Sequence, residues 1–250
     1  IRRQRQMCIR DRAYGEWKDY NAYSDFISSE GVPVFYARVD HVSVPLTQEG
    51  TGQVVVDFTP EPLTQDVSFV FHIEKTADVV VDSLTAEISG IPSTMELTTG
   101  LILAQKTYKL LFRPTYAALP SAADSASAET LRCEASVNIP GIVRSHTEDM
   151  VTGPGILQIA IYTHYDYEEE GTQRKAAKVF HAGINLYHTL KERKSLQWDE
   201  EENGYRQASR SITVEIGSPL NIDKDGILNG GSTSTGLDQW IPGETFEIEV

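Results

Sequence analysis

The sequence predicts an all-β protein: a two-sheet β-sandwich with Greek-key connections, preceded by the remnant of a second β domain. Three observations support this fold class. Apolar residues recur at every second position in short runs, which is the period of a strand and not of a helix. Gly, Pro, Asn and Asp, the residues that favour turns, bound these runs. Sheet faces this apolar have to cover each other, and that requires two sheets.

The two clearest strands cover residues 66–74 and 131–139. In the first run, four apolar residues alternate with polar ones and only Val70 breaks the pattern. In the second, the alternation is uninterrupted, and Pro140 and Gly141 end it as a turn. Further strands are expected at 34–46, 52–58, 79–88, 101–113, 155–165, 178–187, 210–216 and 245–250, which are rich in β-branched and aromatic residues.

Two regions lack this alternation. Residues 116–130 are small and polar, so they can bury little and are expected to form a mobile loop between strands. Residues 191–207 are strongly charged. They are expected to form either a long hairpin tip or a short helical excursion.

The first twelve residues do not look like part of the domain. Gln6–Arg12 resembles the in-frame translation of a transposase mosaic end used in sequencing libraries. We therefore expect 1–12 to be a sequencing-adapter artefact; the alternative is a native basic arm for nucleic acid or lipid headgroups. Native sequence would begin near Ala13. Residues 13–47 would be the C-terminal remnant of a truncated N-terminal domain, and 48–250 the sandwich domain.

The charge of the chain argues against nucleic acid as a partner. The whole sequence carries −14, and residues 1–12 contribute +5 − 1 = +4, so the remainder carries −14 − 4 = −18. Phosphate backbones are bound by clustered Lys and Arg, and a surface this acidic repels them.

An ordered series of short motifs resembles one family. The series is the extended segment Pro33–Val39, then Phe58–Leu63, the strand at 66–74, Ala86–Leu97 and a late Trp240-Ile-Pro-Gly. It is similar to the fimbrillin-like surface proteins of Bacteroides-type bacteria, which are fimbrial subunits or anchors. Ser89-Gly90-Ile91, followed by Leu97–Gly100, matches a motif that recurs in the second of this family's two transthyretin-like β-sandwich domains.

The resemblance implies a function without bond-making chemistry. A member of this family is exported to the cell surface, usually on an N-terminal lipid anchor in the outer membrane, and the expected anchor is missing from this fragment. It would act as a fimbrial subunit, anchor or adhesin-type component, without a cofactor. Its partners would be other fimbrial subunits or surface proteins, with a host molecule or a glycan as a further ligand. The membrane would be contacted only through the lipid anchor.

The end of the chain is a candidate for strand donation. In this family a β-strand of one subunit completes the sheet of another, and an open sheet edge accepts such a strand through backbone hydrogen bonds. Residues 245–250 alternate in the required way, with Phe246, Ile248 and Val250 on one face. The alternative is that this strand closes its own sandwich.

A calcium loop is the best metal-site motif in the sequence. Asn221, Asp223 and Asp225, followed by Gly226, match the start of an EF-hand-type loop with oxygen ligands at alternate positions. The glutamate expected at position twelve is replaced by Ser232, and no helix pattern flanks the loop. An ordinary turn closed by an aspartate side chain is the alternative, so no metal is assigned.

Motifs for covalent catalysis are missing from the sequence. It contains no Gly-x-Ser-x-Gly elbow, P-loop or dinucleotide fingerprint. Cys133 lies in a core-strand pattern and is expected to be buried and inert. His164 and Asp166 alternate on one strand, yet a zinc site needs three or four ligands. The chief alternative function is a carbohydrate- or other ligand-binding sandwich module, which would group aromatic side chains on one exposed sheet face or loop end.

Overall fold

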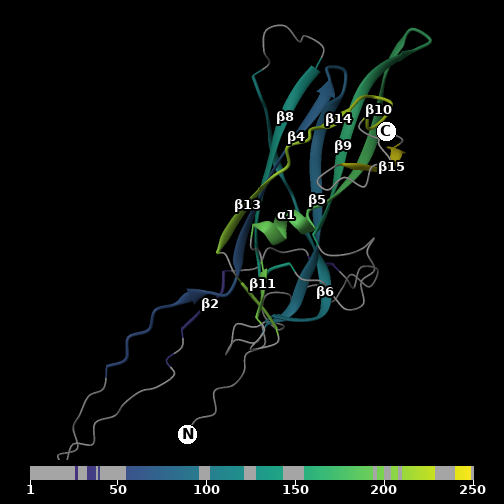
Figure 1. The fold of residues 1–250 in the computed structure, drawn as a ribbon. Helices are drawn as coiled ribbons and strands as arrows, with labels where there is room; N and C mark the ends of the chain where they lie inside the picture. The colour runs from purple at the N-terminus through teal and green to yellow at the C-terminus, as the bar shows by residue number, and fades with distance from the viewer. Residues whose placement is uncertain are drawn as a thin grey trace, which may run out of the picture.

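The structure is a computed structural model that describes eleven parts of the chain: 26–27, 33–37, 39, 55–95, 102–120, 128–142, 155–193, 196–199, 204–207, 210–228 and 240–248. In these parts the protein is all-β, as predicted, with one six-residue helix, α1 (Tyr187–Glu192). Two large sheets face each other, and a two-stranded sheet lies to one side (Figure 1). No helix in the described residues is long and apolar enough to cross a membrane.

The larger sheet has eight strands in the order β11-β12-β6-β5-β9-β10-β15, with β1 paired to β6. Its strands are β1 (Phe26–Ile27), β5 (Val80–Met95), β6 (Ile102–Phe112), β9 (Ile156–Glu169), β10 (Thr172–Asn185), β11 (Leu196–Asp199), β12 (Gly204–Gln207) and β15 (Ile241–Ile248). Neighbouring strands are antiparallel except for β1 and β6. β15 therefore lies at one edge of this sheet (Figure 1).

The smaller sheet has five strands in the order β13-β4-β8-β7, and β14 also pairs with β4. Its strands are β4 (Gln65–Thr76), β7 (Thr115–Ala118), β8 (Ala128–Ile139), β13 (Ser211–Glu215) and β14 (Leu220–Ile222). β13 and β14 follow each other along β4 in the parallel direction, and the other pairs are antiparallel. β2 (Phe35–Tyr36) and β3 (Glu61–Pro62) form the separate two-stranded sheet.

The core is a layer of side chains between the two large sheets. β4 contributes its predicted apolar face, since Val67, Phe69, Phe71 and Ile73 are all fully buried. The Phe69 ring stacks on Phe112 of the opposite sheet, with 5.7 Å between ring centroids. Because these rings come from both sheets, their packing holds the two sheets together.

Most of the predicted strands are confirmed, but several boundaries were wrong. In the predicted strand 52–58, residues 55–58 form no strand. The predicted strand 178–187 begins earlier, at Thr172, and Tyr187 already belongs to α1. The early part of β10 is exposed on both faces, so it lacks the alternation that reveals a half-buried strand. Most of residues 34–46 and all of residues 1–25 lie outside the described residues.

The two irregular regions are more ordered than expected. The predicted loop 116–130 contains most of β7 and the start of β8, although 121–127 lie outside the described residues. Region 191–207 contains both of the predicted structures: it starts with the end of a short helix, α1, and continues with a hairpin of β11 and β12. All four residues of β7 are exposed, which explains why no burial pattern marked it.

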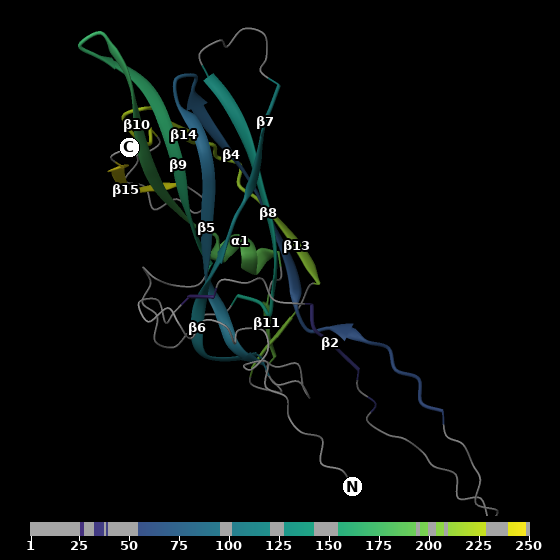
Figure 2. The same cartoon turned by 180° about the vertical axis from the view of Figure 1, so that it is seen from behind.

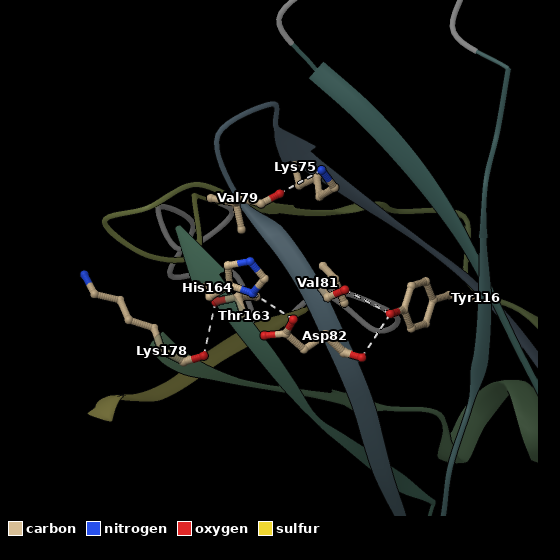
Figure 3. Close-up of polar contacts among 8 residues, drawn as sticks. All are labelled: Lys75, Val79, Val81, Asp82, Tyr116, Thr163, His164 and Lys178. Atoms are coloured by element: carbon tan, nitrogen blue, oxygen red, sulfur yellow. Dashed lines mark hydrogen bonds and ion pairs between the residues drawn. The ribbon is translucent and has the colours of Figure 1, made fainter. Parts of the chain in front are cut away.

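The hydroxyl of Tyr116 in β7 links the smaller sheet to the larger one by hydrogen bonds. The Tyr116 hydroxyl lies 2.9 Å from the backbone oxygen of Val81 and 3.1 Å from that of Asp82, to which it can donate its proton (Figure 3). Both acceptors belong to β5 of the larger sheet. The edge of β5 is open at this point, because its described pairing with β6 starts at Ala86. The hydroxyl therefore satisfies carbonyl groups that no strand reaches.

Two polar groups in the core have distinct explanations. Lys75 is buried, donates from Nζ to the backbone oxygen of Val79 at 2.7 Å and pairs with Glu129 at 2.7 Å, so its charge is compensated. Cys133 is fully buried, as predicted, and burial raises the pKa of its thiol to about 12. The thiolate needed for nucleophilic chemistry is therefore suppressed at neutral pH.

The cross-sheet packing of Phe69 leads to a stability prediction. Phe69→Ala should lower the free energy of unfolding by about 3–5 kcal/mol, because it removes the ring stacked on Phe112 and leaves a cavity. The matched control is Val70→Ala on the same strand, whose side chain points away from the core and should change stability by less than about 1 kcal/mol. Urea denaturation followed by circular dichroism measures both. Equal losses would contradict the assigned core.

Candidate functional site: the outer face of the larger sheet

The outer faces of the two sheets differ in chemistry. On the smaller sheet the outward side chains of β4 and β8 are polar or charged, apart from Val70: Asp66, Ser68, His72, Glu74, Arg132, Glu134, Ser136 and Asn138. This is the ordinary composition of a sheet face in contact with water. The outer face of the larger sheet also carries polar side chains, among them Ser83, Thr85, Glu87 and Gln158, but in addition it presents large apolar side chains.

These apolar side chains share one face of β5, β9, β10 and β15. The strand registers place Tyr162, Val179 and Phe246 side by side across three strands. Val80 and Ile241 point to the same side of the sheet. Phe246 is 51% exposed, Ile241 66%, Val80 45% and Tyr162 36%. We call this surface, completed by His181, the aromatic face.

One of the aromatic rings on this face contacts a neighbouring ring. The Phe246 ring makes an edge contact with His181 at 5.6 Å between centroids. Tyr162 and Phe246 are two strands apart, which separates their backbones by about 10 Å. Two neighbouring positions on the same face hold small residues, Ala160 and Gly183, whose side chains are too short to cover the rings.

A histidine–aspartate pair lies at the border of the aromatic face. The Nδ1 atom of His164 is 2.8 Å from Oδ1 of Asp82, where a β-bulge between Val81 and Ser83 interrupts the β5–β9 register (Figure 3). A catalytic triad would also need a nucleophile bonded to the other ring nitrogen. In the part of the chain that the structure describes, no hydrogen bond joins His164 to a Ser, Thr or Cys side chain. The Asp82 carboxylate therefore orients the imidazole of His164.

The structure describes no metal cluster around the predicted ligands. His164 pairs with Asp82, while Asp166 lies opposite Lys175 in the β9–β10 register. Oδ1 of Asp223 accepts the backbone N–H groups of Asp225 and Gly226, each at 2.8 Å, the geometry of a turn closed by an aspartate. Within the described ranges, no group of three or more His, Cys, Asp or Glu side chains could hold a metal ion. This turn was the alternative to a calcium loop at Asn221, Asp223 and Asp225, to which no metal is assigned.

The predicted donor strand lies in the chain's own sheet. β15 pairs with β10, with Phe246 opposite Val179 and Ile248 opposite Ala177; Val250 lies outside the described residues. This is the internal arrangement considered as the alternative. Donation to another subunit would require β15 to leave β10, and it stays a prediction.

β15 is joined to β10 mainly by backbone pairing. Its described side chains are exposed, whereas Trp240, just before the strand, is buried and donates from Nε1 to the backbone oxygen of Ser218 at 2.9 Å. Lys178 of β10 contributes one further contact, an ion pair with Glu247 at 3.3 Å. Trp240 therefore anchors the start of β15.

Lys178 is a nearly buried amine. It donates to the backbone oxygen of Lys224 at 2.8 Å and lies 5.4 Å from the centroid of the Tyr165 ring. Burial alone would lower the pKa of this amine. Its hydrogen bond with Glu247 and its interactions with Tyr165 outweigh that effect, and the net result is a raised pKa.

Sequence reasoning found Phe246 but missed Tyr162, Val80 and Ile241. One signal was available, since residues 159–162 are apolar at every position and a half-buried strand should alternate. An unbroken apolar run indicates that both sides of the strand carry apolar groups. Which other strands contribute to the same face depends on strand order, which no local pattern contains.

Comparison with known proteins gives one structural similarity. No family model matches the chain, and no curated protein matches it. The chain is similar to a crystal structure described as a "putative adhesin" from Bacteroides ovatus, with a TM-score of 0.37 and 10% sequence identity. The match covers 80% of this chain and 61% of that one. The chain thus spans about three-fifths of the length of the protein it matches.

The Lys178–Glu247 pair predicts a pH dependence. Since the pKa of Lys178 is raised above its ordinary value of 10.5, the pair stabilises the fold below that pH, and the stabilisation disappears as the pH rises through the raised pKa. Glu247→Gln should therefore cost less than about 1 kcal/mol near neutral pH, because Glu247 is mostly exposed. Urea unfolding should show this difference holding between about pH 8 and about pH 10 and shrinking as the pH rises above about 10.5. A constant difference would contradict the pair.

The close approach of β15 to β10 predicts the effect of one glycine substitution. A Cβ added to Gly243 would lie 3.0 Å from Cβ of His181 and 3.2 Å from its backbone oxygen. Gly243→Ala should shift β15 at a cost of about 1–3 kcal/mol and speed amide hydrogen exchange across 241–248. Gly217→Ala is the matched control, because nothing lies within 4 Å of its added Cβ. Unchanged exchange in the Gly243 variant would contradict the observed register.

Proposed function

We propose that this chain is a non-enzymatic, adhesin-type component of a bacterial cell surface that attaches to its target through the aromatic face. The single observation that carries the proposal is the contrast between the two outer faces. Tyr162, Phe246, Val80 and Ile241 gather on one of them, while the other is polar. Contiguous exposed apolar groups are uncommon on a monomer and mark interaction sites. Large aromatic side chains also contribute much of the binding energy at interfaces.

The finer assignment is to the fimbrillin-like superfamily, with a transthyretin-like Greek-key sandwich exported to the outer membrane as a lipoprotein. Its support is the Ser89-Gly90-Ile91 motif, which lies at an irregularity of β5. Gly90 has a φ of 87°, the β5–β6 register shifts between Ile88 and Ile91, and Ile91 is fully buried. Such a bulge needs glycine at the left-handed position. The backbone at this bulge requires the glycine, and this requirement would explain why the motif recurs within a family.

A second candidate function is glycan binding, and the spacing of two rings favours it. Tyr162 and Phe246 are separated by about 10 Å, with Val179 between them, and flat rings stack on the apolar faces of sugar units. Asp82 and His164, which could bind sugar hydroxyls, lie near Tyr162. The target would then be a chain of neutral sugars and not a protein surface.

A bead-adhesion experiment tests the attachment function. Beads carrying the wild-type chain should adhere to cultured epithelial cells, and the Tyr162→Ser/Phe246→Ser variant should lose at least about 30-fold in apparent affinity, since a single interface aromatic can contribute about 2 kcal/mol or more. Ser136→Ala on the opposite, polar face is the control and should adhere normally. Circular dichroism checks that all three proteins are folded.

Treating the cells before the beads are added separates the two candidates. Protease treatment that abolishes adhesion supports a protein target. Periodate, which oxidises the vicinal diols of sugars, abolishes adhesion only if a glycan is bound. Wild-type beads that adhere no better than beads carrying the double variant would overturn the assignment of the aromatic face.

A further inference from the structure

The strand that leads the chain into the sandwich, β4, lies inside the smaller sheet and not at its edge. β8 pairs with one side of β4 over its whole length, Gln65–Thr76. β13 pairs with the other side at 66–70, and β14 continues there at 73–75. Hydrogen bonds to neighbouring strands therefore hold both sides of β4 along most of its length.

The core holds β4 as well. Val67, Phe69, Phe71 and Ile73 are fully buried, and the Phe69 ring stacks on Phe112 of the larger sheet. If β4 slid along its own axis, these four side chains would leave the places that the core provides for them. Exposing buried apolar groups and leaving cavities behind both cost free energy, so the core opposes such a movement.

The residues just before β4 lie at one end of the sandwich. They form β3, and Figures 1 and 2 show β2, the partner of β3, at the end of the molecule opposite to the tip of the β9–β10 hairpin. A pull on residues 61–62 away from the sandwich is therefore directed along β4. The hydrogen bonds of antiparallel strands run across the strand direction. Such a pull loads the bonds of β4 together, in shear, and does not open them one at a time.

β15 is held less firmly than β4. It lies at the edge of the larger sheet, where β10 is its one neighbour among the described strands. A shift in register between Phe180 and Ala182 interrupts this pairing, and the described side chains of β15 are exposed. A pull on β15 across the sheet therefore breaks its bonds to β10 one after another and takes none of its described side chains out of the core.

We propose that β4 carries the tension when the attached protein is pulled away from its target, so that the domain resists a pull on the residues before β4 more strongly than a pull on β15. The inference rests on the proposed attachment through the aromatic face, because an attached protein transmits the force that acts on its target. The path of the tension runs from Tyr162 through the larger sheet and the core, and then along β4 to residues 61–62. The attached domain therefore holds best when the pull comes from the side of the chain that precedes β4.

Single-molecule force spectroscopy on the full chain tests the proposal without a target. In every molecule, one handle is coupled through a non-natural residue in place of Tyr162, where the target would pull. The second handle replaces Glu61 in the β4 pull and Thr245 in the β15 pull, and both of these residues are exposed. At one loading rate, the first rupture should need at least about twice the force in the β4 pull, because forced unfolding reports the rate at which the pulled contacts break and those of β4 have to break together.

A disulfide between β4 and β8 shows which strand carries the tension. Ser68 and Ser136 lie opposite each other with their hydroxyl oxygens 3.2 Å apart. Ser68→Cys/Ser136→Cys therefore brings two thiols together, and Cys8→Ser and Cys133→Ala remove the other two. In the β4 pull, the closed disulfide should raise the rupture force. It should also shorten the released length by about 230 Å at about 3.4 Å per residue, because 136 − 68 = 68 residues stay closed. Dithiothreitol should reverse both changes, and the force in the β15 pull should not change.

Two results overturn the proposal. One is a β4 pull that ruptures at the force of the β15 pull or below it. The other is a rupture force in the β4 pull that stays the same although the shorter released length shows that the disulfide is closed. Circular dichroism checks that each variant is folded. If the change at Tyr162 unfolds the chain, Gln158, which is exposed on the same strand and face, takes the handle.

The test also separates this inference from the proposed function. No target is present in the force measurement, and no force is applied in the bead-adhesion experiment. Loss of adhesion with an unchanged β4 pull therefore contradicts the proposed attachment, whereas equal forces in the two pulls with normal adhesion contradict the path of the tension.

Discussion

The two sheets share one core layer, but they are unequal in size. Alternate side chains of β4 and β8 in the smaller sheet fill the space against β5, β6, β9 and β10 of the larger one. Where the smaller sheet ends, the described residues place no opposing layer over the larger sheet. β15 at its edge and the tip of the β9–β10 hairpin lie in that region (Figure 1). Both are exposed because neither has an opposing sheet against which it can bury a face.

The boundary of the core is marked by buried amines. Lys75 and Lys178 occupy inward strand positions where apolar side chains would otherwise continue, and each donates to a backbone carbonyl and pairs with a glutamate. A long aliphatic stem with a compensated charge suits such a place, because its methylenes extend the core while its amine reaches the rim. Lys178 also lies close to the point where β10 leaves the sandwich.

The sequence by itself determined the class of the fold and the main core strands. Alternation in 66–74 and 131–139 is a local property, and the structure confirms it residue by residue, including the outward position of Val70. The burial of Cys133 followed from the same alternation. These predictions need only the period of a strand and the preference of apolar groups for the core.

Only the tertiary structure decided which strands became neighbours. The aromatic face joins Val80, Tyr162 and Phe246 from strands far apart in the chain, and the Asp82–His164 pair depends on a β-bulge. β7 and the start of β10 left no pattern, because residues exposed on both faces carry no alternation. Strand order and register are set by long-range packing, so the periodicity of one segment predicts that it is a strand and leaves its neighbours undetermined.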